Sequence, residues 1–274
     1  MPPTTIFPTA DAIGHAVASE IVIGLVEATA AGRPYVLGAP SGRTPRSTYR
    51  ALADLLQGRT DVDVTRLQLV MMDDYVVREP GRRAFSRVRP ELPYSCERFA
   101  REEILAPLAA VPGRTGVPER NLHLPDPADP AAYDELIAGL GGVDLFILAT
   151  GASDGHVAFN PPGSAAASLT RVVELSEQTR RDNMLTFAPH FRRLEDVPRH
   201  GVTVGIETIR RHTRRAAMLA IGAGKQKAAA VIAAAEAYSP DWPATIVSEC
   251  ENPSLYLDPA AAAALPASRP AEAR

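Results

Sequence analysis

Residues 144–160 read DLFILATGASDGHVAFN: an apolar run, a short loop with a glycine, and then a carboxylate and an imidazole two positions apart. The run 144–149 has the length and composition of a buried strand. Catalytic side chains of open α/β sheets usually lie where such a strand ends, and Asp154 and His156 follow this one. A carboxylate fixes the tautomer of a nearby histidine and raises its basicity, which suits proton transfer near neutral pH. Taken alone, Asp-Gly-His also fits a simple turn around Gly155.

Apolar runs alternate with amphipathic stretches on both sides of this segment, which is the pattern of repeated βα units. Strands are predicted at 34–38, 67–72, 144–149, 201–205, 216–221 and 254–257, with 170–175 as a further candidate. Helices are predicted at 9–31, 44–56, 95–108, 130–140 and 225–237. We therefore expect an α/β fold, a Rossmann-like open and mostly parallel sheet with helices on both faces.

Three segments depart from the alternation. Residues 78–93 carry prolines and arginines with little periodicity and are predicted to form a surface loop. The polar segment 175–200 fits either a mobile lid over a site or an ordinary long excursion. No repeat or interdomain linker is visible, so residues 1–258 are predicted to form a single domain. The Ala- and Pro-rich residues 259–274 are predicted to be a flexible C-terminal tail.

Composition excludes several classes of partner. The 274 residues carry a net charge of −3, with a pI near 6.1, so no basic field favours nucleic acid or an anionic membrane. No uninterrupted run of about 18 apolar residues predicts a membrane span. The two cysteines, Cys96 and Cys250, show no metal-ligand spacing, so we expect no bound metal and a reduced, cytoplasmic setting.

A loop of small residues follows the strand predicted at 34–38. It contains Ser41, Gly42, Arg43 and Thr44 and leads into a helix. Its backbone N–H groups, its hydroxyls and the positive end of the helix could together bind an anion. The alternative is a tight turn without a ligand, in which Thr44 caps a helix that has Pro45 in its first turn. The loop matches neither common nucleotide-binding motif.

Asp73 and Asp74 follow the strand predicted at 67–72. Adjacent carboxylates repel each other and tend to raise one pKa, which suits a general base. Neighbours on an extended chain point to opposite sides, so we expect one of the two to face a cleft. A solvated turn is the alternative interpretation.

The loop Gly222-Ala223-Gly224-Lys225 follows the strand predicted at 216–221 and adds a cation to another helix start. Lysine is rare in this chain: of its 29 basic residues, two are lysines, Lys225 and Lys227, and the others are arginines. These four loops all follow strands, so a parallel sheet would bring them to one edge. An anion clamp beside acid–base groups favours a sugar phosphate or a similar small anion as the ligand.

The chain resembles the glucosamine-6-phosphate deaminase (isomerase) family, whose fold is shared with 6-phosphogluconolactonases. The resemblance runs from about residue 37 to residue 257, and five segments carry it: LGAPSGRTPRSTY, MDDYV, DGHVAFN, GVTVGIETI and GAGK followed by a helix. DGHVAFN is typical of the deaminase branch, since lactonases usually read DGHTASLFP there.

The resemblance implies a role for each matching residue. The phosphate-binding positions of the family fall on five residues here: Ser41, Gly42, Arg43, Thr44 and Lys225. Asp73 falls on the carboxylate that moves a proton between C2 and C1 of the open-chain sugar. His156 falls on the ring-opening acid, with Asp154 as its partner carboxylate. Ammonia would then leave by hydrolysis of a ketimine. The implied ligand is a hexose 6-phosphate or amino-sugar 6-phosphate, without a metal or organic cofactor, in a homo-oligomer.

Several positions depart from the family pattern. The glutamate that supports the histidine in FNEP is replaced by Pro161, which places efficient deamination in question. The lid arginine aligns with Leu185, and Arg192 or Arg193 is a candidate substitute. In the allosteric basic pair Arg171 matches, but Val173 stands at its partner's position.

Two other functions fit parts of the pattern. A phosphogluconolactonase-like hydrolase would not need the missing glutamate, although Phe159-Asn160 follows the deaminase branch. A non-catalytic sugar-phosphate sensor would fit a degraded catalytic set. Such regulators carry a DNA-binding helix-turn-helix ahead of the domain, whereas the first helix predicted here belongs to the domain itself.

Overall fold

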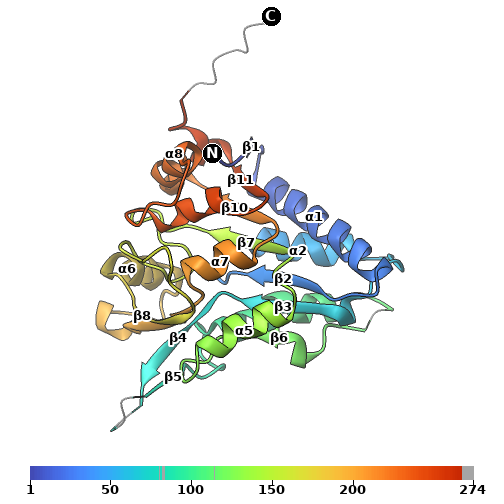
Figure 1. The fold of residues 1–274 in the computed structure, drawn as a ribbon, viewed down its shortest axis with the longest axis horizontal. Helices are drawn as coiled ribbons and strands as arrows, with labels where there is room; N and C mark the ends of the chain where they lie inside the picture. The colour runs from blue at the N-terminus through green and yellow to red at the C-terminus, as the bar shows by residue number, and fades with distance from the viewer. Residues whose placement is uncertain (80, 82–83, 114, 267–274) are drawn as a thin grey trace, which may run out of the picture.

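A seven-stranded parallel sheet forms the centre of the fold (Figure 1). The computed structural model describes residues 1–79, 81, 84–113 and 115–266. Strand order across the sheet is β1-β11-β10-β7-β2-β3-β6. Its strands are β1 (Thr4–Ile6), β2 (Tyr35–Ala39), β3 (Leu67–Met71), β6 (Leu122–His123), β7 (Leu145–Ala149), β10 (Ala216–Ala220) and β11 (Pro253–Leu257). The predicted α/β class and mostly parallel sheet are confirmed.

Helices cover both faces of this sheet. The helices of the described residues are α1 (Ala10–Ala30), α2 (Arg46–Leu55), α3 (Cys96–Phe99), α4 (Ala106–Ala109), α5 (Ala131–Gly139), α6 (Glu177–Thr186), α7 (Ile206–His212), α8 (Gln226–Ala234) and α9 (Pro259–Ala262), of which α6 lies at the cavity described below. Successive strand residues point to opposite faces, so Ile147 packs with α1 and α2 while Leu148 packs with α5, α7 and α8. Two apolar cores therefore sandwich the sheet, which holds the carboxyl ends of its strands in place.

A second sheet of four antiparallel strands adjoins the first, in the order β5-β4-β9-β8. Its strands are β4 (Asp73–Arg78), β5 (Phe85–Arg87), β8 (Arg171–Glu174) and β9 (His200–Thr203). The prediction of a surface loop at 78–93 is therefore wrong for Phe85–Arg87, which pairs with β4. The polar segment after β8 contains α6, which the sequence did not predict.

Helix α1 is long and apolar enough, by length and composition, to cross a membrane. In the fold its apolar side chains have another use: Ile13, Val17, Ile21 and Leu25 are fully buried in one of the two cores. Glu20 on the same helix accepts hydrogen bonds from Arg215 and Tyr256. These contacts account for the composition of α1 as that of a core helix.

Two helices differ from the prediction, one in where it begins and one in its internal geometry. The helix expected from residue 44 begins at Arg46, with Pro45 at the cap position, so Thr44 does not cap it. The helix expected at 95–108 widens into a π-helical stretch at Ala100–Leu105 between α3 and α4.

The C-terminal tail predicted at 259–274 does not begin at its first residues. Pro259–Ala262 forms α9, which Asp258 caps by accepting from the backbone N–H of Ala261, and Ala261 is buried. Residues 267–274 lie outside the described part of the chain.

Candidate active site

A cavity of about 610 Å³ opens at the carboxyl ends of β2, β3, β7 and β10, which are neighbours in the sheet. All four predicted loops contribute to it. Its lining includes seven of the eight predicted site residues: Ser41, Gly42, Arg43, Thr44, Asp73, His156 and Lys225. The eighth, Asp154, holds His156 from behind. Parallel strands thus bring together groups that are up to 184 positions apart in the sequence, from residue 41 to residue 225.

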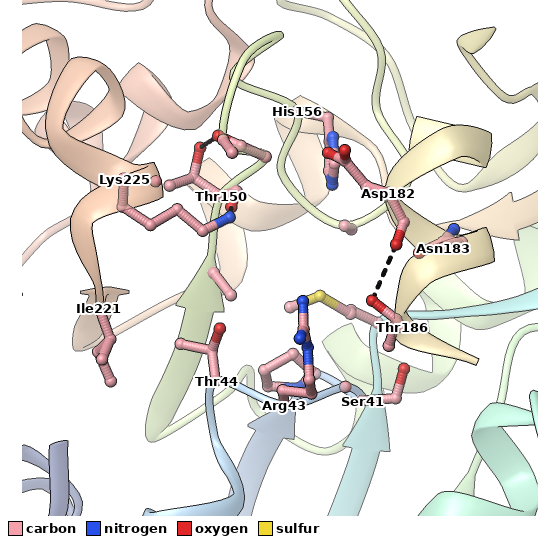
Figure 2. A pocket seen from close by; sticks show the side chains of 18 of the residues that line it. Ser41, Arg43, Thr44, Thr150, His156, Asp182, Asn183, Thr186, Ile221 and Lys225 are labelled. Carbon is pink, nitrogen blue, oxygen red and sulfur yellow. Dashed lines mark hydrogen bonds between the residues drawn. The ribbon is translucent and has the colours of Figure 1, made fainter. Parts of the chain in front are cut away.

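Cations gather on one side of the cavity. Arg43 and Lys225 approach it from different loops (Figure 2). Lys225 donates to the carbonyl oxygen of Thr150 at the end of β7. Burial lowers the pKa of Lys225 and the positive charge of Arg43 lowers it further, although nearby carboxylates act in the opposite direction. Gly42 has a φ of +94°, a conformation that favours glycine in this turn. Two cations held close to each other form a site for an anion.

Asp73 is the candidate general base. It begins β4, is 5% exposed and lines the cavity, while Asp74 is 0% exposed and accepts from the backbone N–H groups of Tyr75 and Cys96. Burial raises the pKa of Asp73 to about 7, against the hydrogen bond that the Cys96 thiol donates at 3.4 Å. Burial also raises the pKa of Asp74 to about 6. The solvated-turn interpretation is wrong, and the prediction that one carboxylate faces a cleft agrees with this geometry.

The Asp154–His156 pair lies at the end of β7. The Oδ1 atom of Asp154 is 2.7 Å from Nδ1 of His156, and its Oδ2 accepts from Ser176 at 2.8 Å and from Thr179 at 3.1 Å. Burial alone would raise the pKa of Asp154, but these hydrogen bonds and the charge of His156 outweigh it and hold that pKa well below its usual range. An ionised Asp154 keeps the proton on Nδ1. Nε2 is then the atom available for proton transfer.

Helix α6 covers the cavity and supplies groups that the sequence reasoning missed. Ser176 caps this helix and, with Thr179, binds Asp154. Asp182, one turn further along, lines the cavity. A serine directly before a polar helix, such as Ser176, is a preferred cap residue. Nothing in the sequence showed that these side chains would reach residues more than twenty positions away.

The positions that depart from the family pattern lie as follows. Leu185 is 71% exposed at the rim of the cavity. Arg192 and Arg193 are exposed, and Arg193 pairs with Asp196, so neither substitutes for a lid arginine in this conformation. Arg171 donates to Asn160 at 2.9 Å. Within the described ranges, no group of three or more His, Cys, Asp and Glu side chains is arranged to hold a metal ion.

Comparison with known families decides the relationship. Residues 8–256 match the family model described as glucosamine-6-phosphate isomerases/6-phosphogluconolactonase. The chain belongs to this family. A glucosamine-6-phosphate deaminase from Beutenbergia cavernae is 38% identical over 230 residues, which cover 84% of this chain and 81% of that protein. A glucosamine-6-phosphate deaminase from Rhodococcus jostii is 35% identical over 251 residues, 90% of this chain and 88% of that protein.

Solved structures of this glucosamine-6-phosphate isomerase/6-phosphogluconolactonase family share the fold. A monomeric glucosamine-6-phosphate deaminase superimposes with a TM-score of 0.79 and 25% identity, covering 96% of this chain and 99% of that one. The 6-phosphogluconolactonase from Trypanosoma brucei gives a TM-score of 0.67 at 22% identity over 97% of this chain and 99% of that one. The second comparison shows the fold alone.

Proposed function

We propose that this protein is a sugar-phosphate aldose–ketose isomerase/deaminase that acts on an amino-sugar 6-phosphate such as glucosamine 6-phosphate. One observation carries the proposal: a buried carboxylate, Asp73, and His156, which Asp154 holds in place, line one cavity together with Arg43 and Lys225. Its relatives named as glucosamine-6-phosphate deaminases support the substrate class.

The phosphate would bind at the cationic side. Backbone N–H groups of the loop at Gly42, the hydroxyls of Ser41 and Thr44, and the charges of Arg43 and Lys225 supply its donors. Desolvation strengthens these interactions, because Lys225 is largely removed from water. Binding the phosphate there places the rest of the sugar toward Asp73 and His156.

Two proton-transfer steps then follow from the geometry. His156 donates a proton to the ring oxygen O5 as the C1–O5 bond breaks and the C1 hydroxyl loses its proton to water, which yields the open-chain aldehyde. Asp73 removes the proton from C2 while O1 takes up a proton from water, which gives an enolamine. Asp73 then returns its proton to C1 and the nitrogen loses one to water, so that the C2 amine becomes a ketimine. A carboxylate with a pKa near 7 is a stronger base than an exposed one and is still ionised in a useful fraction at neutral pH. Water adds to the ketimine and ammonia leaves, giving the ketose phosphate.

Pro161 has no side-chain group that can exchange a proton, so it cannot perform the role that the resemblance gives to a glutamate there. In this structure the hydroxyls of Ser176 and Thr179 support the pair instead, through Asp154. Positioning by hydroxyls is compatible with ring opening. We therefore expect proton exchange at C2 even if ammonia release is slow.

The test is incubation with glucosamine 6-phosphate in deuterated water, followed by NMR and an ammonia assay. Ammonia together with fructose 6-phosphate supports deamination, and deuterium at C1 or C2 without ammonia supports an isomerase that stops early. Asp73→Asn is expected to reduce the rate of ammonia release and the rate of deuterium incorporation by at least about a thousandfold, since it removes the base. Asp241→Asn, an exposed carboxylate outside the cavity, serves as the control. Full turnover of the amino sugar by Asp73→Asn would contradict the proposal. So would a protein that hydrolyses 6-phosphogluconolactone faster than its spontaneous hydrolysis and leaves glucosamine 6-phosphate unchanged.

A further inference from the structure

Helix α6 brings a carboxylate into the cavity. Asp182 is half-buried on the inner side of this helix, and its Oδ1 accepts from Gln178 at 3.0 Å. Figure 2 shows its side chain extending from α6 toward His156, across the cavity from Lys225. Its charge reaches Lys225, because Asp182 is the carboxylate that most opposes the lowering of the Lys225 pKa. Asp182 is therefore inside the electrostatic field of the site.

The charged side chains of α6 point in different directions, and those other than Asp182 have partners outside the cavity. Arg180 donates to the carbonyl oxygens of Leu194 and Val197, and Arg181 pairs with Glu177 on the exposed side. Among the charged side chains of α6, which lies wholly within the described residues, Asp182 is the one that lines the cavity. The helix over an anion site thus contributes a negative charge to it and no positive one.

A ligand that spans this cavity meets opposite charges at its two ends. Arg43 and Lys225 favour an anion on one side, whereas Asp182 and Asp73 disfavour a second anion on the side of His156. Lys225 does not neutralise Asp182 directly, because its ammonium donates to the carbonyl oxygen of Thr150 instead. The Asp182 carboxylate therefore keeps bonding capacity for a group of the ligand.

We propose that Asp182 is a specificity-determining residue, whose carboxylate binds the ammonium group of an amino-sugar phosphate and selects it over analogues with a hydroxyl or carboxylate there. This inference rests on the proposed function and names the feature that selects its substrate class. A sugar ammonium bound by a partly exposed carboxylate forms a charge-assisted hydrogen bond, which an uncharged hydroxyl does not replace in strength. A carboxylate at the same position on a ligand would be repelled.

Binding of two non-reactive ligands separates selectivity from turnover. We would measure the Kd of 2-amino-2-deoxyglucitol 6-phosphate and of glucitol 6-phosphate by calorimetry at pH 7. Neither alditol has a carbonyl group, so neither can be isomerised. The wild-type protein should bind the amine about tenfold more tightly than the alcohol, and this preference should weaken as salt is added. Asp182→Asn should reduce the ratio to about twofold or less while changing the Kd of the alcohol little.

The matched control is Glu177→Gln, which removes the same charge from the same helix on its exposed side. It should leave the amine preference intact. Asp182→Ala provides a second variant if the asparagine disturbs the helix, and thermal melting verifies that each variant is folded. An unchanged ratio in folded Asp182 variants would overturn the inference, as would equal affinities in the wild-type protein. Failure of the wild-type protein to bind either alditol would instead overturn the proposed sugar-phosphate site, and the inference with it.

Discussion

Two hydroxyl groups fix the acid–base pair from the direction of α6. Asp154 uses one carboxylate oxygen for His156 and the other for Ser176 and Thr179. The Thr179 hydroxyl is also 3.1 Å from Nδ1 of His156. This carboxylate is held by three side-chain donors and by the backbone N–H of His156, so it cannot rotate without losing hydrogen bonds, and the imidazole keeps one orientation toward the cavity. Thr179 thus acts through its neighbours as a positioning residue.

Thr179→Val tests that role, because it replaces the hydroxyl group with a methyl group of similar size. A hydrogen bond to a charged group contributes about 1.5–3 kcal/mol, so we expect kcat to fall roughly ten- to a hundredfold. KM should change less than about threefold, because the phosphate contacts are untouched. Thr179→Ser retains the hydroxyl and should recover most of the activity. Steady-state kinetics of the three proteins is the measurement, and equal losses in the valine and serine variants would point to packing instead of hydrogen bonding.

At the scale of elements, α6 is attached to the molecule at both ends. Its first turn is held by Asp154, and Phe187, just after its last turn, contacts Tyr75, Tyr94 and Phe191 with ring centroids 6.0–6.4 Å apart. Between these anchors lie the side chains that cover the cavity. We interpret this arrangement as the lid that the sequence allowed as one alternative, held over the cavity by an aromatic contact at one end.

Phe187→Ala should loosen this lid. Each aromatic pair contributes about 0.5–1.5 kcal/mol beyond its buried area, so losing three of them should raise KM by at least about tenfold. Amide hydrogen exchange in residues 177–187 should accelerate, while kcat changes less than KM. Phe85→Ala is the matched control. Phe85 packs against His200 and Arg78 in the four-stranded antiparallel sheet, and it does not line the cavity. Unchanged exchange in α6 after Phe187→Ala would show that the aromatic contact does not hold the lid.

The sequence predicted some elements well, and physical reasons separate these from the rest. Strands such as β7 and β10 are continuous apolar runs because both of their faces are buried, and such runs are visible in one sequence. A single residue, Met72, separates the end of β3 from the start of β4, with no turn signal, so the passage from one sheet to the other is invisible in the sequence. β5 is short and half-buried, and no apolar pattern marks it.

The candidate site likewise has residues that the sequence predicted and residues that it did not. Asp73, His156 and Lys225 could be predicted because each follows a strand of a parallel sheet, and topology then brings them to one edge. The contributions of α6 could not, because they depend on how a polar helix docks onto that edge. The position of Asp182 in the cavity depends on tertiary packing, and no periodic pattern in the sequence predicts it.

At the scale of the whole molecule, the number of subunits stays a prediction. A homo-oligomer is expected from the resemblance, whereas one structural relative is a monomeric deaminase. In the described part of the protein, the cavity lining comes from one chain and includes both the cations and the acid–base groups.

The buried base should also reduce the stability of the whole fold at alkaline pH. The pKa of Asp73 is about 7 in the folded protein, against a reference value of 3.8, so between these values the folded state binds more protons than the unfolded state. Stability consequently falls as pH rises from about 4 to about 7, by at most about 4 kcal/mol from this group, and stays reduced above it. Asparagine mimics the protonated form. Asp73→Asn should therefore melt several degrees higher than the wild-type protein at pH 8, and within about a degree of it at pH 4.5.

Thermal melting from pH 4.5 to 8.5 measures this difference, with Asp241→Asn as a control for the loss of an exposed charge. Asp74, whose pKa is raised to about 6 by burial, stays in both proteins, so some pH dependence should remain below pH 6 in the variant. A constant difference in melting temperature across the range would indicate that the substitution acts through packing. A smaller stability of Asp73→Asn at pH 8 would show that the ionised carboxylate is better solvated than its buried position implies. The expected gain in stability with loss of activity would mean that the fold tolerates a destabilising charge because the proton transfer requires it.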